Sequence, residues 1–347
     1  MRRPVPAVDV QVVRWQKAYG RNHLPWQQTR DPYRVWLSEV MLQQTQVSTV
    51  LDYYPRFIER FPDVKALAAA SEDDVLALWS GLGYYSRARN LHRCAQQVVS
   101  AHGGNFPNSA QLLESLPGIG RSTAGAIAAF CFAQRVPILD ANVRRVLTRV
   151  LAFGGDLALT AKVNELWDLA DALLPHENLP ESMPRYTQGL MDLGAGVCLS
   201  RKPLCGQCPL QDQCAALKEG VPERYPVKTR KLVRKAQSWW LLLLRDGADR
   251  VWLQRRPSTG IWAGLYCLPV YVDQDLLMNH PLLARATHMK ELPAFLHVLT
   301  HRDLYLHTLR AHLELGEPVG DDGAWFALDQ ALALGLPAPI RKLLEGC

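Results

Sequence analysis

Four cysteines lie close together in one short segment of this 347-residue chain, while the other four are scattered along it. This distribution argues against a framework of disulfide bonds and for a set of metal ligands. Four thiolates within one loop suit either Zn²⁺ or an iron–sulfur cluster on chemical grounds. Zinc ribbons usually carry two C-x2-C pairs and this segment has one, so zinc is the less natural choice. The four residues are Cys198, Cys205, Cys208 and Cys214.

The composition of the chain is that of a globular protein. Its length of 347 residues and hydrophobic content of 48% are sufficient for two domains with a core in each. The net charge of +6 is compatible with a polyanionic partner but does not require one. The longest apolar run, Trp239 to Leu244, is far too short to span a bilayer, and no signal-peptide pattern opens the chain. We therefore expect a soluble cytoplasmic protein that does not bind a membrane.

The spacing of apolar residues divides the chain into two parts. From about Asp9 to Leu217 they recur every three or four residues, which is typical of helices. After a basic, proline-containing stretch the pattern becomes strand-like, with two runs around an Asp-Gly turn. We predict a mainly α region over residues 1–227, a linker over 228–236 and an α+β domain over 237–347. In "LYLHTLRAHLEL" the residues expected on one side of a strand are Leu309, Ala311, Leu313 and Leu315.

The stretch "LPGIG", residues 116–120, predicts a tight turn between two helices. Pro117 ends the first helix, while Gly118 and Gly120 permit positive φ and the close approach of a ligand. The second helix begins at Arg121, and its first amides and its dipole make an anion site that fits a phosphate. Such a turn is a plain connector about as often. The turn alone therefore leaves both interpretations open.

The positions of two carboxylates in the sequence are compatible with either a functional or a structural role. Asp140 follows a buried apolar approach and lies where an N-cap belongs, so it is either only a cap or a functional group. Glu39 lies one helical turn from Trp36 and from Leu42, and so points into an apolar region. Desolvation there would raise its pKa and keep it protonated near neutrality, as a general acid requires. A paired core glutamate is the equally weighted alternative.

Five blocks of sequence occur in an order and spacing that resemble the helix-hairpin-helix DNA glycosylases, and in particular the MutY family of adenine DNA glycosylases. The likeness covers nearly all of residues 15–217. It implies a six-helix hairpin module followed by a module with a [4Fe-4S] cluster on the four cysteines, and it leaves zinc as a minor alternative. The blocks are "LPW", "WLSEVMLQQTQV", "GLGYYSRARNL", "LPGIGRSTAGAI" and "ILDANVRRVL".

The resemblance also implies roles for single residues. Glu39 and Asp140 match the family's two carboxylates, which implies that adenine is flipped from bent DNA and its glycosidic bond cut. Protonated Glu39 would donate to adenine N7, while ionised Asp140 would stabilise the positive sugar. Asn142 matches the asparagine of the family's D-x-N motif and would orient Asp140 or the sugar phosphate. Family positions near the lesion strand and near adenine are occupied by Gln44, Leu82 and Tyr84, and by Gln188, respectively.

Ser122 limits the chemistry that the resemblance implies. Related enzymes with lyase activity carry a lysine at this position, whose amine attacks the sugar and forms a Schiff base. With Ser122 we predict a monofunctional glycosylase that leaves an intact abasic site. Gly118 and Gly120 would let the backbone grip a DNA phosphate.

The function implied is base excision repair of adenine mispaired with 8-oxoguanine, and more weakly with guanine, in double-stranded DNA. A monomer is expected in the bacterial cytosol with the nucleoid, with abasic-site repair enzymes acting downstream. One alternative is a glycosylase and lyase of the endonuclease III type for oxidised pyrimidines, against which Ser122 and the "LQQT" block argue. Another is a DNA-binding or redox-sensing iron–sulfur protein without enzymatic activity, against which Glu39 and Asp140 argue.

The C-terminal part resembles the Nudix-like domain of the same family through "RPSTGIWAGLYCLP" and "LGLPAPIRKLLE". The glutamate-rich helix of a Nudix hydrolase has no counterpart between Gly264 and Leu296, so we expect no nucleotide hydrolysis. The family uses this domain to recognise 8-oxoguanine, partly through a Phe-Ser-His loop. This chain has Leu299, Thr300 and His301 there: the hydroxyl and the histidine are retained, and Leu299 departs from the pattern. Without the resemblance, a Thr-His pair beside a turn would be ordinary loop polarity.

Overall fold

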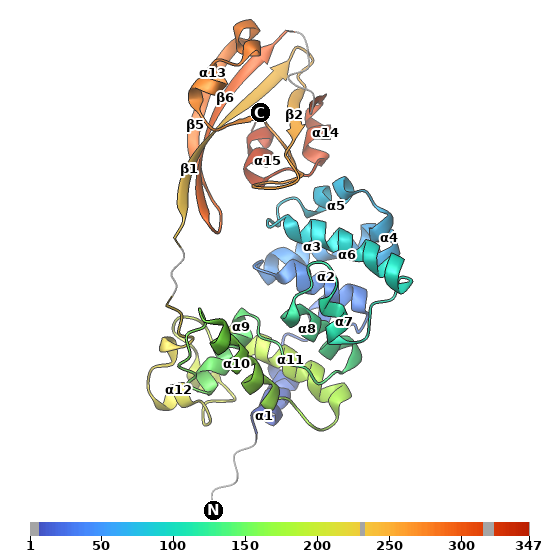
Figure 1. Cartoon of the computed structure of the whole chain (residues 1–347), viewed down its shortest axis with the longest axis vertical. Coiled ribbons are helices and arrows are strands. Elements are labelled where there is room, and N and C mark those ends of the chain that lie inside the picture. The colour runs from blue at the N-terminus through green and yellow to red at the C-terminus, as the bar shows by residue number, and fades with distance from the viewer. Residues whose placement is uncertain (1–6, 230–232, 315–322, 347) are drawn as a thin grey trace, which may run out of the picture. The chain divides into compact units, whose positions relative to one another are not determined.

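The computed structural model describes residues 7–229, 233–314 and 323–346. Helices form the first part of the chain, and a sheet with short helices forms the second (Figure 1), which confirms the predicted fold class. The helices of the first part are α1 (Val8–Tyr19), α2 (Pro32–Leu42), α3 (Val47–Arg60), α4 (Val64–Ala69), α5 (Glu72–Trp79), α6 (Ser86–His102), α7 (Ala110–Glu114), α8 (Arg121–Phe132), α9 (Ala141–Val150), α10 (Thr160–Ala172), α11 (Leu179–Gly196) and α12 (Ala215–Lys218).

Contacts group the chain into two compact units that no single cut in the sequence separates. One unit comprises residues 1–54, 58–68 and 93–231. The other joins residues 232–347 to residues 55–57 and 69–92. The C-terminal sheet therefore shares its unit with α5 and with the loop that follows it. The boundaries at 227 and 237 remain predictions, and residues 230–232 of the expected linker lie outside the described residues.

The turn between α7 and α8 uses one glycine in the left-handed region. Gly118 has a φ of +76°. Gly120 is the N-cap of α8 with a φ of −90°, so of the two glycines that permit positive φ, Gly118 adopts it and Gly120 does not. Between them, Ile119 is 4% exposed and anchors the turn in the core. A Cβ added at Gly120 would meet no described atom within 4 Å, so the space beside it is open to a ligand.

The helix that follows Asp140 packs closely against α11. Ile138 and Leu139 are buried, and they bring the chain to the start of α9. Gly194 of α11 lies against Asn142 of α9, where an added Cβ would come within 2.5 Å of the Asn142 Cβ. Real Cβ atoms do not approach so closely, because packed interiors have no room for such an overlap. A glycine at position 194 is therefore what lets α11 approach the start of α9 so closely.

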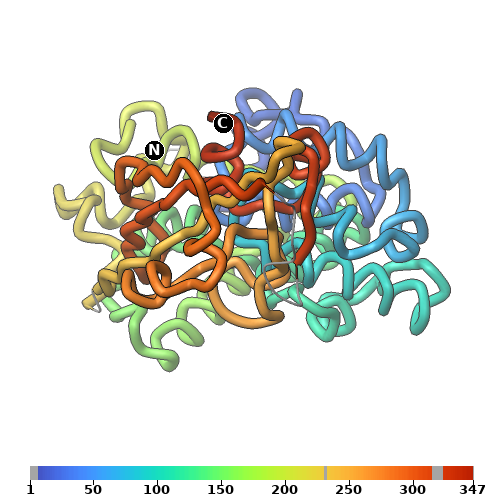
Figure 2. The backbone as a smooth tube through the Cα atoms, turned by 90° about the horizontal axis from the view of Figure 1, so that it is seen from above, coloured from blue at the N-terminus to red at the C-terminus, as the bar shows by residue number. Residues whose placement is uncertain are grey.

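The second part of the chain is built on a seven-stranded sheet with the order β3-β2-β1-β6-β5, to which β4 and β7 add by pairing with β1 and β2. β1 and β6 run parallel, with Lys235 opposite Arg302 and Asp246 opposite Leu313. The sheet and the last two helices form the orange-to-red part of the trace in Figure 2. The elements are β1 (Lys235–Asp246), β2 (Val251–Arg255), β3 (Tyr266–Cys267), β4 (Val270–Tyr271), α13 (Gln274–Met278), β5 (Thr287–Val298), β6 (Arg302–Leu313), β7 (Gly323–Phe326), α14 (Leu328–Ala333) and α15 (Ala338–Glu345).

The predicted pattern of this sheet is confirmed where it is described. β1 and β2 flank the Asp-Gly turn, in which the Asp246 carboxylate accepts hydrogen bonds from the backbone N–H groups of Ala248 and Arg250. Leu309, Ala311 and Leu313 belong to one buried cluster, and Leu315 lies outside the described residues. In the part of the chain that the structure describes, none of the helices combines the length and apolar character needed to cross a membrane.

Candidate active site

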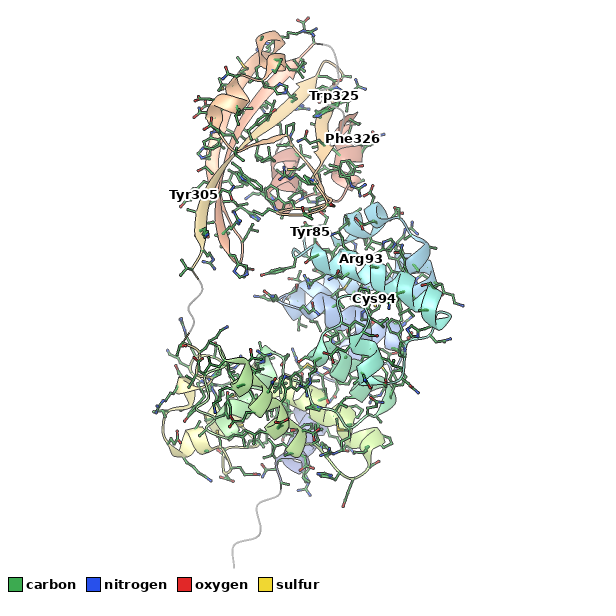
Figure 3. All side chains as sticks on the ribbon, viewed as in Figure 1. Tyr85, Arg93, Cys94, Tyr305, Trp325 and Phe326 are labelled. Carbon is green, nitrogen blue, oxygen red and sulfur yellow. The ribbon has the colours of Figure 1, made fainter. Side chains whose placement is uncertain are left out.

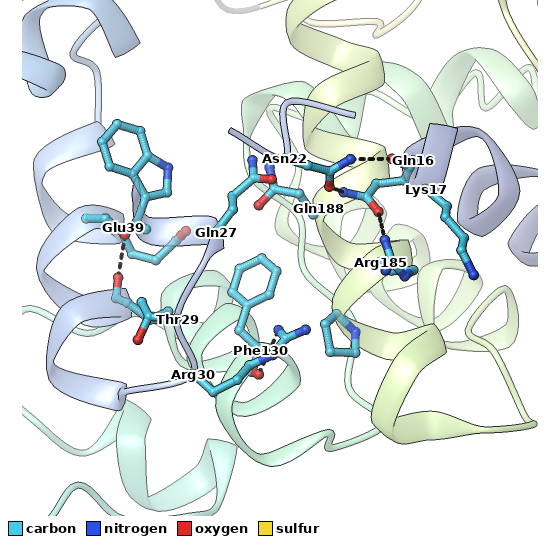
Figure 4. Close-up of a pocket in the computed structure, with 14 residues that line it drawn as sticks. Gln16, Lys17, Asn22, Gln27, Thr29, Arg30, Glu39, Phe130, Arg185 and Gln188 are labelled. Atoms are coloured by element: carbon cyan, nitrogen blue, oxygen red, sulfur yellow. Dashed lines mark hydrogen bonds between the residues drawn. The ribbon is translucent and has the colours of Figure 1, made fainter. Parts of the chain in front are cut away.

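A polar pocket of about 250 Å³ opens among α1, α2, α8 and α11 (Figure 4). Most of its walls come from the segment between α1 and α2 and from the inward face of α2. Two of its arginines are already paired with neutral acceptors, Arg30 with the Phe130 carbonyl at 3.0 Å and Arg185 with the Gln16 amide oxygen at 3.0 Å. The titratable acid in the lining is Glu39.

Glu39 points into this pocket from α2 (Figure 4). Its helix is capped by Asp31, whose carboxylate accepts from the Tyr33 backbone N–H, and the residues around Glu39 on α2 are buried. Burial raises the pKa of Glu39 to about 8, and the negative charge of nearby Asp140 adds to the increase. The shift in pKa predicted from the sequence is therefore confirmed. A carboxyl group with this pKa carries its proton at neutral pH and can donate it.

Asp140 is held at the N-terminus of α9 by the backbone of that helix. Its carboxylate accepts from the Val143 N–H at 2.7 Å and also from the Asn142 N–H. Burial raises the pKa of Asp140, while these two N–H groups, Arg145 and Arg144 oppose the increase by stabilising the charged form. Asp140 thus has hydrogen-bond donors and positive charges beside it that favour its charged form, whereas burial and the charge of Asp140 both favour the protonated form of Glu39. Two neighbouring carboxyl groups with unequal environments divide into an acid and a carboxylate.

Ser122 and Asn142 both lie beside Asp140. The Ser122 hydroxyl accepts from the backbone N–H of Leu139, the residue before Asp140, at 2.9 Å. The Asn142 side-chain oxygen accepts from Arg145 at 2.8 Å, so its amide oxygen is directed to Arg145. Arg145 also donates to the Cys198 carbonyl at 2.7 Å, which links the end of α11 to the start of α9. Ser122 and Asn142 thus both lie next to Asp140 in the fold, and the charge of Asp140 acts on Glu39.

Two amide side chains line the same pocket. Gln188, predicted near adenine, is 8% exposed and donates to the Asp192 carboxylate at 2.9 Å. Gln27 was not predicted. Both polar atoms of its side-chain amide are buried and have no hydrogen-bond partner among the described residues. The sequence signal was available, because Gln27 directly follows the "LPW" block. Buried amides without partners are rare in proteins, and they suggest a ligand that would satisfy them.

Residues predicted to contact the lesion strand are exposed loop residues with one exception. Gln44, in the turn between α2 and α3, is exposed with a φ of +57°. The Tyr84 ring is 45% exposed, and its hydroxyl lies 2.9 Å from the Thr300 hydroxyl. Thr300 and exposed His301 form the tip of the β5–β6 hairpin, which the Leu299 N–H closes on the Arg302 carbonyl at 2.8 Å. Leu82 is only 6% exposed, so its side chain belongs to the core here.

The four clustered cysteines line one apolar recess between α9, α11 and the loop before α12. Arg149 donates to the Cys198 sulfur at 3.3 Å, and burial raises the pKa of Cys208 to about 11. Such thiols become thiolates only when a bound cation favours the charged form. Within the described ranges no three His, Cys, Asp or Glu side chains are arranged to hold one metal ion.

Comparison with known proteins agrees with this geometry. Residues 37–169 match the HhH-GPD superfamily of base excision DNA repair proteins, residues 198–214 the iron-sulfur binding domain of endonuclease III, and residues 240–346 the NUDIX domain. The adenine DNA glycosylase of Buchnera aphidicola subsp. Acyrthosiphon pisum is 35% identical over 340 residues, which cover 96% of this chain and 95% of that protein. The chain belongs to the adenine DNA glycosylase family. It is therefore an enzyme that binds DNA and hydrolyses an N-glycosyl bond in base excision repair, and its cysteine segment is an iron–sulfur motif.

More distant relatives of this adenine DNA glycosylase define which parts are shared. The human adenine DNA glycosylase is 34% identical over 363 residues, which cover 86% of this chain and 66% of that protein. Among solved structures, a thermostable thymine-DNA glycosylase is 26% identical with a TM-score of 0.55 and covers 61% of this chain and 95% of its own. A non-covalent endonuclease III–DNA complex has a TM-score of 0.51 at 21% identity, covers 61% of this chain and 94% of its own, and shares the fold. These two solved structures thus share their fold with 61% of this chain.

Proposed function

We propose that the enzyme removes adenine mispaired with 8-oxoguanine, and more weakly adenine mispaired with guanine, from double-stranded DNA. The observation that carries the proposal is Glu39, which lines a polar pocket and has a pKa of about 8, together with the nearby carboxylate of Asp140, whose charge acts on it. The glycosidic bond lies inside the duplex, so the adenine nucleotide must be flipped out to reach them.

Once the adenine is flipped, the two carboxyl groups divide the reaction. Protonated Glu39 donates to adenine N7, which makes the base a better leaving group as the bond between N9 and the sugar C1′ breaks. The sugar becomes positively charged, and ionised Asp140 stabilises it until water adds to C1′. The products are free adenine and an abasic site. The different surroundings of the two groups support this assignment, since backbone N–H groups and arginines favour the charged form of Asp140 while burial and a neighbouring negative charge favour the protonated form of Glu39.

The pocket supports recognition of a flipped base. Gln27 and Gln188 each carry one donor group and one acceptor atom, which match the mixed donor and acceptor pattern of the adenine edge. Gln27 has no other described partner for its amide, so a base in the pocket would satisfy it. We propose that these two amides orient adenine so that N7 faces Glu39.

Ser122 supports a monofunctional enzyme. A lyase needs an amine to form a Schiff base with the sugar, and the Ser122 hydroxyl is instead engaged with the Leu139 N–H. We propose that the enzyme leaves the abasic site intact, as a monomer acting on DNA in the bacterial cytosol, and that abasic-site repair enzymes act next.

The remaining contacts with DNA are proposed from the exposed loops. The open space at Gly120 and the N-terminus of α8 are suited to a DNA phosphate. Tyr84 and Gln44 would fill or probe the stack that flipping disrupts, and stacking on an aromatic ring contributes about 1–3 kcal/mol per base. Thr300 and His301 would contact 8-oxoguanine in the opposite strand.

We propose that the cluster is of the [4Fe-4S] type, held by Cys198, Cys205, Cys208 and Cys214. Such a cluster gives the chain a structural centre in which the four thiols are ionised. Metal analysis of the purified protein should give about four irons per chain and a brown colour. Stoichiometric zinc without iron would refute this assignment.

A nicking assay tests the reaction itself. Duplexes with 8-oxoguanine·adenine, guanine·adenine or thymine·adenine pairs are incubated with the enzyme and then analysed with and without alkali. We expect cleavage at the adenine strand only after alkali, most with 8-oxoguanine, less with guanine and none with thymine. Strand scission without alkali would disprove the monofunctional assignment, and absence of cleavage in both mispairs would disprove the substrate.

A further inference from the structure

The C-terminal domain contacts the loop that carries Tyr84 at a second place, away from Thr300 and within the same compact unit. The carbonyl of Leu336, between α14 and α15, accepts from the Ser80 hydroxyl at 3.0 Å and from the Tyr85 hydroxyl at 2.9 Å. Tyr85 is labelled in Figure 3 at the start of α6. All three residues are at most 9% exposed, so water does not compete for these bonds.

An arginine from α15 completes this buried contact. The Arg341 guanidinium donates to the Ser80 hydroxyl through Nε and Nη2, both at 3.2 Å, and to the Leu334 carbonyl at 3.3 Å. Ser80 thus donates to one group of the C-terminal domain and accepts from another. Hydrogen bonds from a charged donor are stronger than neutral ones. We call this set, Ser80, Tyr85, Leu336 and Arg341, the anchor.

The loop between these two contacts contains three residues with a left-handed backbone conformation. Gly81, Gly83 and Tyr84 have φ values of +103°, +73° and +49°. A left-handed conformation is unfavourable for a residue with a side chain such as Tyr84, and it persists where the surroundings impose it. The Tyr85 hydroxyl lies 3.4 Å from the Gly81 N–H, so the same side chain contacts the loop and Leu336.

Side chains of α5 and α6 also form hydrogen bonds with the backbone of this loop. Arg87 donates to the Leu82 and Gly83 carbonyls at 3.2 and 3.1 Å, and the Trp79 indole donates to the Gly83 carbonyl at 3.2 Å. These bonds lie on the side of α5 and α6. The anchor is the contribution of the C-terminal domain to the base of the same loop.

We infer that the anchor is a positioning site, through which the C-terminal domain holds residues 81–84 in the conformation that presents Tyr84 to DNA. The domain then serves adenine excision in two ways: directly through Thr300 and His301, and indirectly through the loop. Tyr85 and Arg341 are positioning residues that do not touch DNA themselves. The inference rests on the proposed function only in assigning Tyr84 to the lesion strand.

Hydrogen exchange of the protein without DNA tests the positioning directly. Tyr85→Phe keeps the ring and removes the hydroxyl, and Arg341→Met keeps the stem and removes the donors. The matched control is Asp73→Asn, which weakens the ion pair of Asp73 with Arg255, at 2.5 Å, between the same two parts but at the start of α5. We expect exchange of amides 80–85 to accelerate by about 3- to 10-fold in the two anchor variants, as loss of one hydrogen bond implies, and Arg341→Lys to restore part of the protection. The control should leave these amides unchanged.

Binding and turnover of an 8-oxoguanine·adenine duplex supply the second measurement. We expect Tyr85→Phe and Arg341→Met to raise Kd by about 3- to 10-fold, while the single-turnover rate at saturating enzyme stays within about 2-fold of wild type. Unchanged exchange at residues 80–85, or equal acceleration in Asp73→Asn, would overturn the inference. If the wild-type enzyme does not excise adenine, the proposed function fails, and the exchange comparison still decides whether the anchor positions the loop.

Discussion

The two groups of side chains that the proposed reaction needs differ in their surroundings. Glu39 and Asp140 lie within the helical unit, where burial and hydrogen bonds change their pKa values. Tyr84 and Thr300 lie in the other unit, where Tyr84 is 45% exposed, Thr300 is partly exposed and their hydroxyl groups share one hydrogen bond. The pKa values of Glu39 and Asp140 are changed in the protein without DNA, whereas the exposed side chains act only through contact with DNA. In the proposed reaction, catalysis would therefore be set up in advance and lesion reading would be completed on binding.

The largest effect should come from the carboxyl groups. Glu39→Gln and Asp140→Asn keep the size of the side chains and remove the acid and the charge. We expect the single-turnover rate of adenine release to fall by about 10²- to 10⁴-fold, the usual contribution of general acid catalysis. Binding of the mispaired duplex, measured by fluorescence anisotropy, should change little. Substantial activity in Glu39→Gln would show that the buried acid is not the proton donor.

The pH dependence of the excision rate also tests the role of Glu39. Because the pKa of Glu39 is about 8, the donor loses its proton as the pH rises, and the excision rate should fall above pH 8 with a slope of one proton. Rates measured from pH 6 to 10 on saturated enzyme check this. A decline already complete by pH 6 would mean that Glu39 has an ordinary pKa and that another group donates.

The stability of the folded protein should also depend on the ionisation of Glu39. Folding raises the pKa of Glu39 from the ordinary value of 4.5 to about 8, so the folded state binds more protons than the unfolded state between these values. This contribution is complete below pH 4.5 and is lost as the pH rises through 8, by at most about 1.4 kcal/mol per pH unit for one proton. Glu39→Gln should therefore melt at a higher temperature than wild type at pH 8.5, with a smaller difference at pH 6. Equal differences at both pH values would contradict the assignment.

A smaller effect on the excision rate is expected from Gln27, whose side-chain amide has no described hydrogen-bond partner in the pocket. Gln27→Leu would leave the polar edge of a bound adenine without a partner, which costs about 1–3 kcal/mol and lowers the excision rate by roughly 10- to 100-fold. Gln28→Leu is the matched control, since the neighbouring Gln28 is exposed and does not line the pocket. Similar losses in both variants would indicate a general disturbance of this segment.

The smallest effect should come from the exposed tip of the β5–β6 hairpin. Thr300→Ala removes the hydroxyl that contacts Tyr84, and Thr300→Ser retains it. We expect Thr300→Ala to reduce the preference for 8-oxoguanine over guanine by about 2- to 10-fold, because one hydrogen bond contributes about 0.5–1.5 kcal/mol. Thr300→Ser should keep the preference. If both mispairs lose activity equally, Thr300 supports the loop and does not read the lesion.

Much of this organisation could be predicted from local sequence. The cap at Asp140, the turn before α8 and the change from helices to strands depend on neighbours close in the chain, and they were predicted correctly. The raised pKa of Glu39 was also predicted, from the apolar residues beside it on α2, although Asp140 adds to the shift from a distant part of the chain. The sequence shows that Gly118 and Gly120 permit positive φ, and only the structure shows that Gly118 adopts it and Gly120 does not. Gln27 was missed because its lack of partners depends on residues distant in sequence.

The sequence by itself determined the two carboxylates, the four cysteines and the absence of a lysine at position 122, since these are matters of residue identity. Only the tertiary structure decided which of them meet. It brought α2 and the start of α9 close enough for Asp140 to raise the pKa of Glu39. It also grouped residues 69–92 with the C-terminal sheet and placed Tyr84 against Thr300, 216 residues away in the chain. Contacts of that separation arise from the packing of whole elements, which no local pattern encodes.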